Sequence, residues 1–318
     1  MHNIDAYRVE GTAFLFEDPD FSVVRDCVPG QAYEPVVATL LSAALHQPNA
    51  RFADIGALYG FFSCWAARHV PGLSVVAFEP EPAYAEVMRR NIERNRVTVE
   101  VAQVALVDRV RSVSFHGRTV EPDTQWATWR RSYLRSLRNV PGRVVERRRG
   151  GTRPVVAGDN APTAGWLAVP LRTRQVERAK TRTTDPVLVT HTVAGIDLDT
   201  YAERKGWYPS VAKIDVHGGE GLVLRGMRSV LAKHIDHLFL ELHTPDYLVD
   251  TTYEEIFDLL EEAGLVLYDL RGFRHRRGAL VPITEERRRA ICDPRTWTPE
   301  ELYYMRFLYA CRPGCELA

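Results

Sequence analysis

The stretch Asp54-Ile55-Gly56-Ala57-Leu58-Tyr59-Gly60 follows a short apolar run, Arg51 to Ile55, and precedes a helical pattern over 61–69. Glycine adopts positive φ readily and lets a ligand approach the backbone, so this stretch predicts a strand, a binding turn and a helix. The N–H groups at the start of that helix would face an anionic group. The glycines have GxxxG spacing, which differs from the GxGxxG of dinucleotide-binding turns.

Further strand and helix patterns alternate on both sides of this turn. We expect helices at 34–47, 61–69, 82–94, 197–205, 219–233 and 252–263, and strands at 51–55, 73–78, 97–105, 112–116, 187–192, 210–216, 237–242, 265–270 and 303–310. Such alternation indicates right-handed βαβ units in a parallel sheet. The predicted fold class is therefore α/β: a doubly wound, mostly parallel, seven-stranded Rossmann-like sheet whose last strand, 303–310, is antiparallel.

The alternating pattern stops near residue 118 and resumes near 187. Residues 119–185 carry 14 Lys and Arg against six Asp and Glu. Their aromatic residues, Trp126, Trp129 and Tyr133, are interleaved with arginines. This segment could be a lid over the substrate, a helix packed on the core, or a surface that binds single-stranded RNA. We divide the chain into an N-terminal extension (1–30), a cofactor-binding half (31–118), an inserted cap (119–185) and a second half (186–318).

The overall composition limits the possible classes of protein. Of 318 residues, 45% are hydrophobic and 26% charged, as in soluble globular enzymes, and the net charge is zero, which disfavours a nucleic-acid enzyme. No long apolar run predicts a membrane span, and the first residues do not form a signal peptide. The five cysteines form no CxxC pair, which favours reduced thiols. We expect a cytoplasmic protein, and the composition leaves an oligomer possible.

Two acidic residues indicate the kind of ligand. Asp54 precedes the first glycine of the turn, where a carboxylate suits an ammonium group better than a pyrophosphate. Glu79 follows the second strand, where an acidic residue accepts hydrogen bonds from a ribose diol. S-adenosylmethionine combines an amino-acid group with a ribose and an adenine, so we expect this cofactor.

Five segments resemble a known family. They are Tyr33-Glu34-Pro35, Phe52-Ala53-Asp54-Ile55-Gly56-Ala57, Ala77-Phe78-Glu79-Pro80, Val104-Ala105-Leu106-Val107-Asp108 and Lys213-Ile214-Asp215-Val216-His217-Gly218-Gly219-Glu220. In these segments, and most specifically in the last, the chain is similar to the FkbM-type family of S-adenosylmethionine-dependent methyltransferases. The family often has Asp-Val-Glu-Gly where this chain has Asp215-Val216-His217-Gly218, so the resemblance does not define the role of His217.

The resemblance implies the class I methyltransferase fold and a set of cofactor-binding residues. The methionine end would contact Asp54, Gly56, Ala57 and Gly60, the ribose Glu79, the adenine Gln103 to Ala105, and the transferable methyl group Asp215. Tyr33, Glu34 and Tyr59 lie in or next to the matching segments and complete the predicted set.

Methyl transfer to a hydroxyl group needs alignment and a base. His217 and His243 both follow strands, and either could be that base. Asp215 and Glu241 complete the predicted catalytic set, since they could orient an imidazole or bind the substrate. Glu220 could also orient an imidazole, or could simply begin a helix.

We therefore predict an O-methyltransferase that acts on a hydroxyl of a small molecule, either a specialised metabolite or a sugar moiety. The alternatives are an RNA or protein methyltransferase that docks through the basic insertion, and a cofactor-binding protein without catalysis. Asp215, Glu241 and His243 could chelate Mg²⁺, but Mg²⁺ prefers carboxylates and water, so we expect no metal.

Overall fold

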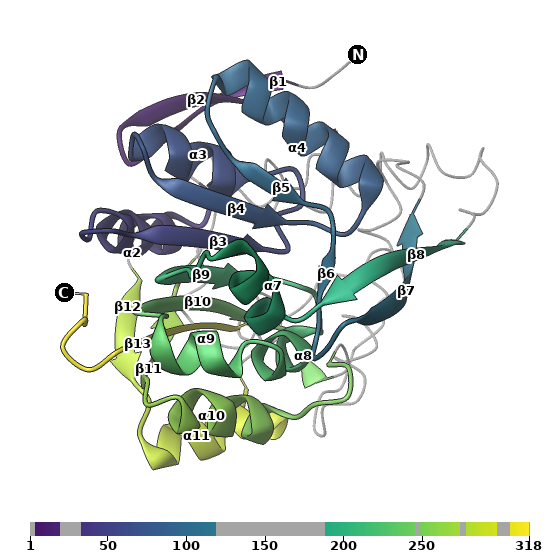
Figure 1. The fold of residues 1–318 in the computed structure, drawn as a ribbon. Coiled ribbons are helices and arrows are strands. Elements are labelled where there is room, and N and C mark those ends of the chain that lie inside the picture. The colour runs from purple at the N-terminus through teal and green to yellow at the C-terminus, as the bar shows by residue number, and fades with distance from the viewer. Residues whose placement is uncertain are drawn as a thin grey trace, which may run out of the picture.

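The computed structural model describes residues 4–19, 33–118, 188–245, 248–273, 278–297 and 306–317. The strands of its main sheet are β3 (Arg51–Ile55), β4 (Ser74–Phe78), β5 (Glu100–Ala102), β9 (Val211–Ile214), β10 (His237–Leu242), β11 (Val266–Arg271), β12 (Ala279–Pro282) and β13 (Arg306–Cys311). Their order is β12-β11-β13-β10-β9-β3-β4-β5 (Figure 1). Strands β10, β9, β3, β4 and β5 are parallel, and β13 is antiparallel to both its neighbours. The doubly wound α/β fold and its last antiparallel strand are confirmed.

Helices cover both faces of this sheet. They are α2 (Pro35–Leu45), α3 (Phe61–His69), α4 (Pro82–Asn95), α7 (Leu198–Lys205), α8 (Glu220–Arg225), α9 (Arg228–Lys233), α10 (Tyr253–Glu262) and α11 (Glu285–Cys292), with a 3-10 turn, η2 (Pro294–Thr296). Successive residues of a strand point to opposite faces of the sheet. Ala53 of β3 packs in the cluster with α7 to α10, whereas its neighbour Phe52 packs in the cluster with α2 and α3. Because both faces are buried, these strands are mostly apolar and do not alternate between apolar and polar residues. In the part of the chain that is described, no helix has the length and apolar character needed to span a membrane.

The main sheet has eight strands, one more than the sequence predicts. The additional strand, β12, pairs antiparallel with β11 at the edge of the sheet. Its four residues, Ala279-Leu280-Val281-Pro282, are too few to show an alternating pattern, so only the pairing itself defines the strand.

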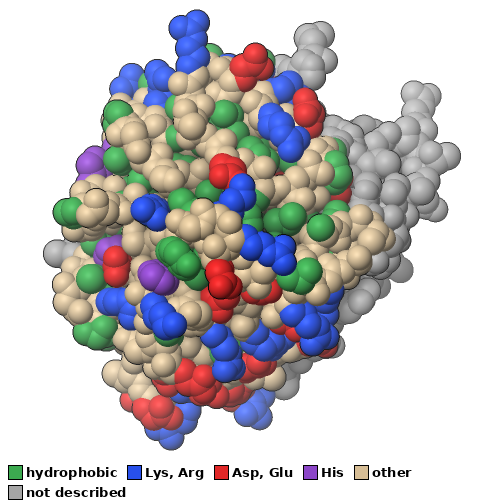
Figure 2. All heavy atoms as spheres, viewed as in Figure 1, with side chains coloured by type: hydrophobic (Ala, Val, Ile, Leu, Met, Phe, Trp, Pro, Cys, Tyr) green, Lys and Arg blue, Asp and Glu red, His purple; other side chains and the backbone are tan. Residues whose placement is uncertain are grey.

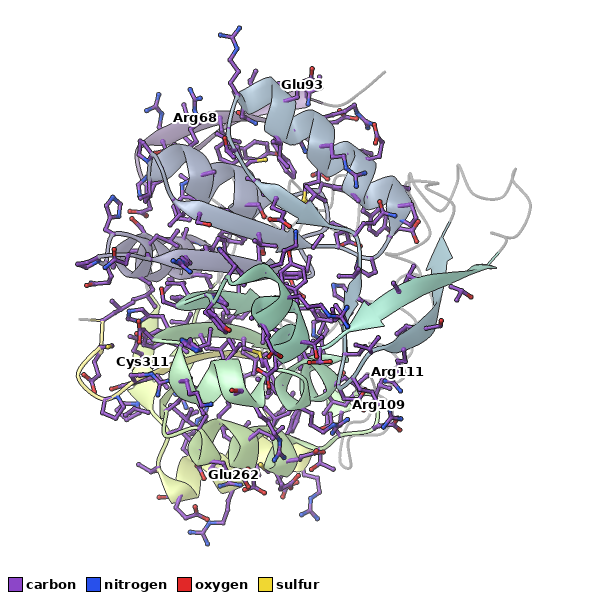
Figure 3. All side chains as sticks on the ribbon, in the orientation of Figure 1. Arg68, Glu93, Arg109, Arg111, Glu262 and Cys311 are labelled. Atoms are coloured by element: carbon purple, nitrogen blue, oxygen red, sulfur yellow. The ribbon has the colours of Figure 1, made fainter. Side chains whose placement is uncertain are left out.

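A second, small sheet projects from the main one. It consists of β6 (Ala105–Leu106), β7 (Arg111–Arg118) and β8 (Leu188–Ile196), in the order β6-β8-β7. The prediction that 97–105 is one strand is wrong, because the chain leaves the main sheet after β5 and joins the small one at β6. The small sheet connects directly to both ends of the predicted insertion, which lies outside the described residues together with Trp126, Trp129 and Tyr133. Arg109 and Arg111, labelled in Figure 3, form ion pairs with Asp108 in the segment where β6 leads into β7.

The predicted helix over 219–233 is interrupted at Gly226, where α8 ends before α9 begins. A Cβ atom at Gly226 would lie 1.9 Å from the carbonyl oxygen of Val107. The backbone carbonyl of Gly226 also accepts a hydrogen bond from the Asp199 N–H. This contact between distant segments, which no local pattern reveals, explains the break.

Part of the predicted N-terminal extension forms a hairpin of β1 (Ile4–Val9) and β2 (Thr12–Glu17). Phe14 and Phe16 enter the core on the α2 and α3 side. Arg68 of α3, labelled in Figure 3, donates to the Ala13 carbonyl oxygen at 2.6 Å and to the Asn95 carbonyl oxygen at 3.2 Å, which ties the hairpin to α3 and α4.

The strand order reverses between β3 and β9, and at such a point doubly wound sheets bind ligands beyond the carboxyl ends of the strands. Gly56 follows β3 at this point, with φ of +80°, and a Cβ atom there would lie 1.9 Å from the Asp215 carbonyl oxygen. The glycine is therefore required both by its backbone conformation and by the close approach of the two strand ends.

Replacing Gly56 by alanine should lower the thermal unfolding temperature more than replacing Gly72. Gly72 also has positive φ, of +84°, but a Cβ atom there meets nothing within 4 Å. Gly72→Ala therefore measures the cost of the left-handed conformation alone, roughly 1–2 kcal/mol. Gly56→Ala adds the collision with Asp215. Equal shifts for the two variants, measured by calorimetry, would contradict this explanation.

Candidate active site at the carboxyl edge of the sheet

Backbone hydrogen bonds hold the ends of β9, β3 and β4 together. The Asp215 N–H donates to the Ile55 carbonyl oxygen at 2.9 Å, and the N–H groups of Gly56 and Ala57 both donate to the Phe78 carbonyl oxygen. The sheet thereby brings together four of the predicted side chains, Asp54, Glu79, Asp215 and His243, each at or just beyond a strand end. The site is thus built on strand ends, with only short turns beyond them.

Glu79 lies beyond β4 with its carboxylate held by two backbone donors. Its Oε2 accepts from the Leu58 N–H and its Oε1 from the Glu81 N–H, both at 2.9 Å. The side chain is 6% exposed, and burial raises its pKa to about 8 against the lowering effect of these hydrogen bonds. Each carboxylate oxygen has a second lone pair, so a pair of ligand hydroxyls could still be bound.

Asp54, the last residue but one of β3, is buried beneath α3. Its Oδ2 accepts a hydrogen bond of 2.5 Å from the Ser63 hydroxyl. Burial raises the pKa of Asp54, although Lys213 and Ser63 act in the opposite direction.

Lys213, which the sequence analysis did not assign to the site, is the buried cation at its centre. Its Nζ lies 3.3 Å from Asp215 Oδ2 and 5.2 Å from the centre of the Phe62 ring. Burial lowers the pKa of Lys213, but the surrounding carboxylates raise it further, so that the net pKa is above its ordinary value. These carboxylates belong to Asp215, Glu34, Asp54 and Glu241. A lysine within the buried strand Val211-Ala212-Lys213-Ile214 was the signal available in the sequence.

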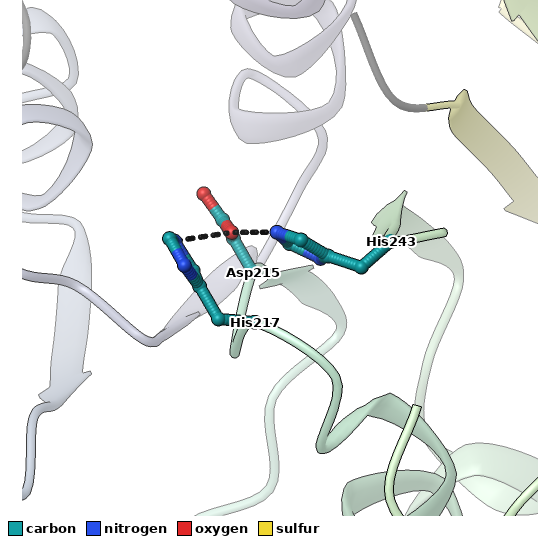
Figure 4. Close-up of side chains that lie close together, drawn as sticks. All are labelled: Asp215, His217 and His243. Carbon is teal, nitrogen blue, oxygen red and sulfur yellow. Dashed lines mark ion pairs between the residues drawn. The ribbon is translucent and has the colours of Figure 1, made fainter. Parts of the chain in front are cut away.

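The imidazoles of His217 and His243 lie near Oδ1 of Asp215, the carboxylate oxygen that does not contact Lys213 (Figure 4). Asp215 Oδ1 lies 3.6 Å from His217 Nε2 and 3.9 Å from His243 Nε2, and the two ring centres are 4.7 Å apart. Burial raises the pKa of Asp215, but Lys213 and the two imidazoles outweigh this and hold it below its ordinary value. Asp215 is therefore an anion between three nitrogen-bearing side chains.

Glu220 orients His243 and also begins α8, so both predicted roles apply. Glu220 Oε1 lies 2.8 Å from His243 Nδ1 and accepts a hydrogen bond from the Gly218 N–H. Both side chains are almost fully buried. Burial lowers the pKa of His243, but Glu220 raises it, and the net result is about 9.

His217 differs from His243 in exposure and in backbone conformation. Its side chain is 64% exposed, and its φ is +53°. A non-glycine residue in this region is strained by roughly 1–3 kcal/mol, and such residues cluster at functional sites. The turn at His217 and Gly218 directs the chain so that the imidazole faces Asp215.

The remaining predicted residues have varied surroundings. Glu241 is buried, and its carboxylate is one of those that raise the pKa of Lys213. Glu34 begins α2 and is 1% exposed. The Tyr33 ring packs on Phe61 and Phe62, whereas the Tyr59 ring is buried against Tyr84. At the edge of the site, Gln103 accepts a hydrogen bond from Arg89, and Ala105 begins β6.

The two glycines of the turn are needed for packing against protein. A Cβ atom at Gly60 would lie 2.5 Å from the Met88 side chain, as one at Gly56 would meet Asp215. These contacts concern only the direction in which a side chain would point, so the close approach of a ligand to the backbone at these glycines stays a prediction.

Comparison with known proteins agrees with this geometry. The family model described as the methyltransferase FkbM domain matches residues 54–267. The 31-O-demethyl-FK506 methyltransferase FkbM of Streptomyces tacrolimicus is 28% identical over 221 residues, which cover 67% of this chain and 72% of that protein.

Solved structures with some similarity are also methyltransferases. Methyltransferase FkbM from Methylobacillus flagellatus KT has 10% identity and a TM-score of 0.42, with 92% of this chain and 58% of that chain covered. The present chain thus spans little more than half the length of that protein. A SAM-dependent methyltransferase from Agrobacterium tumefaciens has 9% identity and a TM-score of 0.41, with 98% and 71% covered.

The family match extends from Asp54 in the first strand of the site to Leu267 in β11 and includes Glu79, Asp215 and His243. The chain belongs to the family of methyltransferases with an FkbM domain, and its doubly wound sheet is the class I methyltransferase fold.

Proposed function

We propose that this protein uses S-adenosylmethionine to methylate a hydroxyl oxygen of a small molecule, a specialised metabolite or a sugar moiety, in the cytoplasm. The observation that carries the proposal is the meeting of Asp54, Glu79 and Asp215 with two imidazoles at the point where the strand order reverses. The Streptomyces relative supports oxygen as the acceptor, because its name describes a methyltransferase acting on a 31-O-demethyl compound.

The residues present fit this cofactor, which supplies an electrophilic methyl group on a sulfonium. The Glu79 carboxylate is fixed by two backbone donors and retains lone pairs for the ribose hydroxyls. The carboxylates around Lys213 outnumber its single charge, which favours a ligand carrying an ammonium and a sulfonium. We assign Asp54, Gly56, Ala57 and Gly60 to the methionine end, Gln103 and Ala105 to the adenine, Asp215 to the methyl group, and Tyr33, Glu34 and Tyr59 to the surrounding wall.

The acceptor's hydroxyl proton would be removed by the cluster of Asp215, His217 and His243. Glu220 fixes the orientation of the His243 ring, and Asp215 lies between the two imidazoles. Of the two, His217 is the exposed one, so it is placed to meet an acceptor that enters from solvent. Glu241 would contribute through its charge beside Lys213, which in turn binds Asp215.

The charge distribution on the face shown in Figure 2 suits a small-molecule substrate better than a nucleic acid. Basic and acidic side chains intermingle over α10 and α11, where Arg288 pairs with Asp258 and Glu261. A nucleic-acid surface would instead gather basic residues on one side.

Glu79→Gln should have opposite effects on two properties: it should weaken cofactor binding, and it should raise the unfolding temperature relative to wild type at high pH. At pH 9, where Glu79 is ionised, loss of a charged acceptor should weaken S-adenosylhomocysteine binding by roughly tenfold or more, since hydrogen bonds to charged groups are worth about 1.5–3 kcal/mol. The folded-state pKa of Glu79 is raised to about 8, so its contribution to stability is lost as pH rises from its ordinary pKa through 8. The unfolding temperature of Glu79→Gln should therefore rise relative to wild type between pH 6 and pH 9.

Titration calorimetry and thermal unfolding of the cofactor-free protein measure these two effects, and Glu86→Gln, an exposed acid on α4, serves as the control. Unchanged S-adenosylhomocysteine affinity in Glu79→Gln would remove the ribose assignment. A constant difference in unfolding temperature across this pH range would contradict the raised pKa.

The reaction itself can be tested with a methyl-labelled donor and a panel of hydroxylated acceptors. For an acceptor that is methylated, Asp215→Asn should lower turnover about 100-fold or more, as expected when the proton-accepting group is disabled. His46→Ala removes an exposed histidine far from the site and should leave turnover unchanged. Binding of S-adenosylhomocysteine without transfer to any acceptor would instead favour a cofactor-binding protein.

A further inference from the structure

Two nitrogens and one oxygen point to a common space in the cluster of Asp215, His217 and His243. Each side chain offers one ligand atom, and these atoms all lie within 4.8 Å of one another. We propose that the three side chains bind a divalent transition-metal ion of the zinc or iron class. The metal site rests on this geometry alone, whereas its part in catalysis rests on the proposed function.

The two oxygens of the Asp215 carboxylate have different surroundings. Oδ2 accepts from Lys213, while Oδ1 is buried and has no hydrogen-bond partner among the described residues. Its distances to the two Nε2 atoms, 3.6 and 3.9 Å, are too long for hydrogen bonds. Ligands of one metal lie about 3–3.5 Å apart when metal–ligand bonds are about 2.0–2.2 Å long. Small rotations of the rings would therefore complete the site.

Glu220 gives His243 the arrangement common among metal-bound histidines. Such histidines donate their second ring N–H to a carboxylate, which fixes the tautomer and aims the other nitrogen at the metal. Glu220 Oε1 lies 2.8 Å from Nδ1 of His243, and Nε2 faces Asp215. With both side chains almost fully buried, this orientation is maintained before any ion arrives.

The turn after β9 supplies the third ligand at an energetic cost. His217 has φ of +53° and Gly218 has φ of +104°, and this backbone places an exposed imidazole beside Asp215. Because the His217 ring is exposed, while Asp215 is partly buried and His243 is buried, the open coordination positions would face solvent and an incoming acceptor.

The side chains around the proposed metal site carry an excess of negative charge, which favours binding of a cation. The carboxylates of Glu34, Asp54, Asp215 and Glu241 surround Lys213, and Glu220 adds one more beside His243. A divalent ion would compensate this excess. Two imidazoles favour zinc, iron, nickel or copper over magnesium, which distinguishes this site from the Mg²⁺ site with Glu241 considered from the sequence. The ligand set that the structure brings together contains His217 in place of the Glu241 considered from the sequence.

A metal here would change how the hydroxyl proton leaves. An ion held by Asp215, His217 and His243 would supply Lewis-acid chemistry: it would lower the pKa of an acceptor hydroxyl beside it, and the released proton would pass to water. The two imidazoles would then act as ligands, whereas in the metal-free protein one of them accepts the proton.

The test uses the full-length protein, treated with a chelator and then titrated with Co²⁺ alone, followed by visible absorption, and with Zn²⁺ in competition. We expect one equivalent of Co²⁺ to give the absorption of a nitrogen- and oxygen-bound ion that Zn²⁺ displaces. His217→Asn, which tolerates the left-handed backbone, and Asp215→Asn should each weaken binding by at least about tenfold. Glu220→Gln should weaken it about 10–100-fold. His46→Ala should bind like wild type.

Absence of Co²⁺ binding, or binding that His217→Asn and Asp215→Asn leave unchanged, would overturn the site. S-adenosylhomocysteine titration of the same chelated protein keeps the two proposals distinct. Cofactor binding and methyl transfer without any metal would refute the catalytic role of the ion while leaving the proposed function intact. Metal binding without methyl transfer to any acceptor would leave the metal site standing and contradict the proposed function.

Discussion

The buried ammonium of Lys213 is the interaction on which the arrangement of the site depends. Moving a charge out of water costs several kcal/mol unless partners compensate it, and here carboxylates from α2, β3, β9 and β10 do so. Removing the lysine would leave those carboxylates uncompensated, which typically costs about 3–5 kcal/mol. By holding Oδ2 of Asp215, Lys213 also fixes the direction of Oδ1 toward the two imidazoles.

The contact between β3 and β9 determines where this charged cluster lies. The two strands are parallel neighbours on either side of the reversal in strand order, so their side chains meet where such folds bind ligands. Gly56 allows the turn after β3 to touch the Asp215 backbone, and the hydrogen bond from the Asp215 N–H to Ile55 fixes that approach. Packing at Gly56 and the position of Asp215 are therefore not independent properties.

Local pattern was sufficient to predict much of the fold and part of the site. The helix over 61–69 and the strand over 51–55 were predicted correctly, because their apolar residues define them. The break at Gly226 was not, since it arises from a contact with the distant Val107. The edge strand β12 was not either, since its four residues are too few to show a pattern. Lys213 was missed because a single lysine in a strand does not reveal its partners. The hydrogen bond between Glu220 and His243 depends on how a turn and a strand end meet in space.

The surplus of negative charge connects the individual properties of the site. Glu79 and Asp54 have raised pKa values because they are buried, and His243 has one because it faces Glu220, so all three retain protons more strongly than in water. In the ligand-free protein, Lys213 provides compensating positive charge, and a proton on Glu79 removes one negative charge at neutral pH. A cationic ligand can take their place, since it offers the same charge together with contacts that protons lack. A site built in this way selects for positive charge before it selects for shape, which suits a sulfonium cofactor and a metal ion alike.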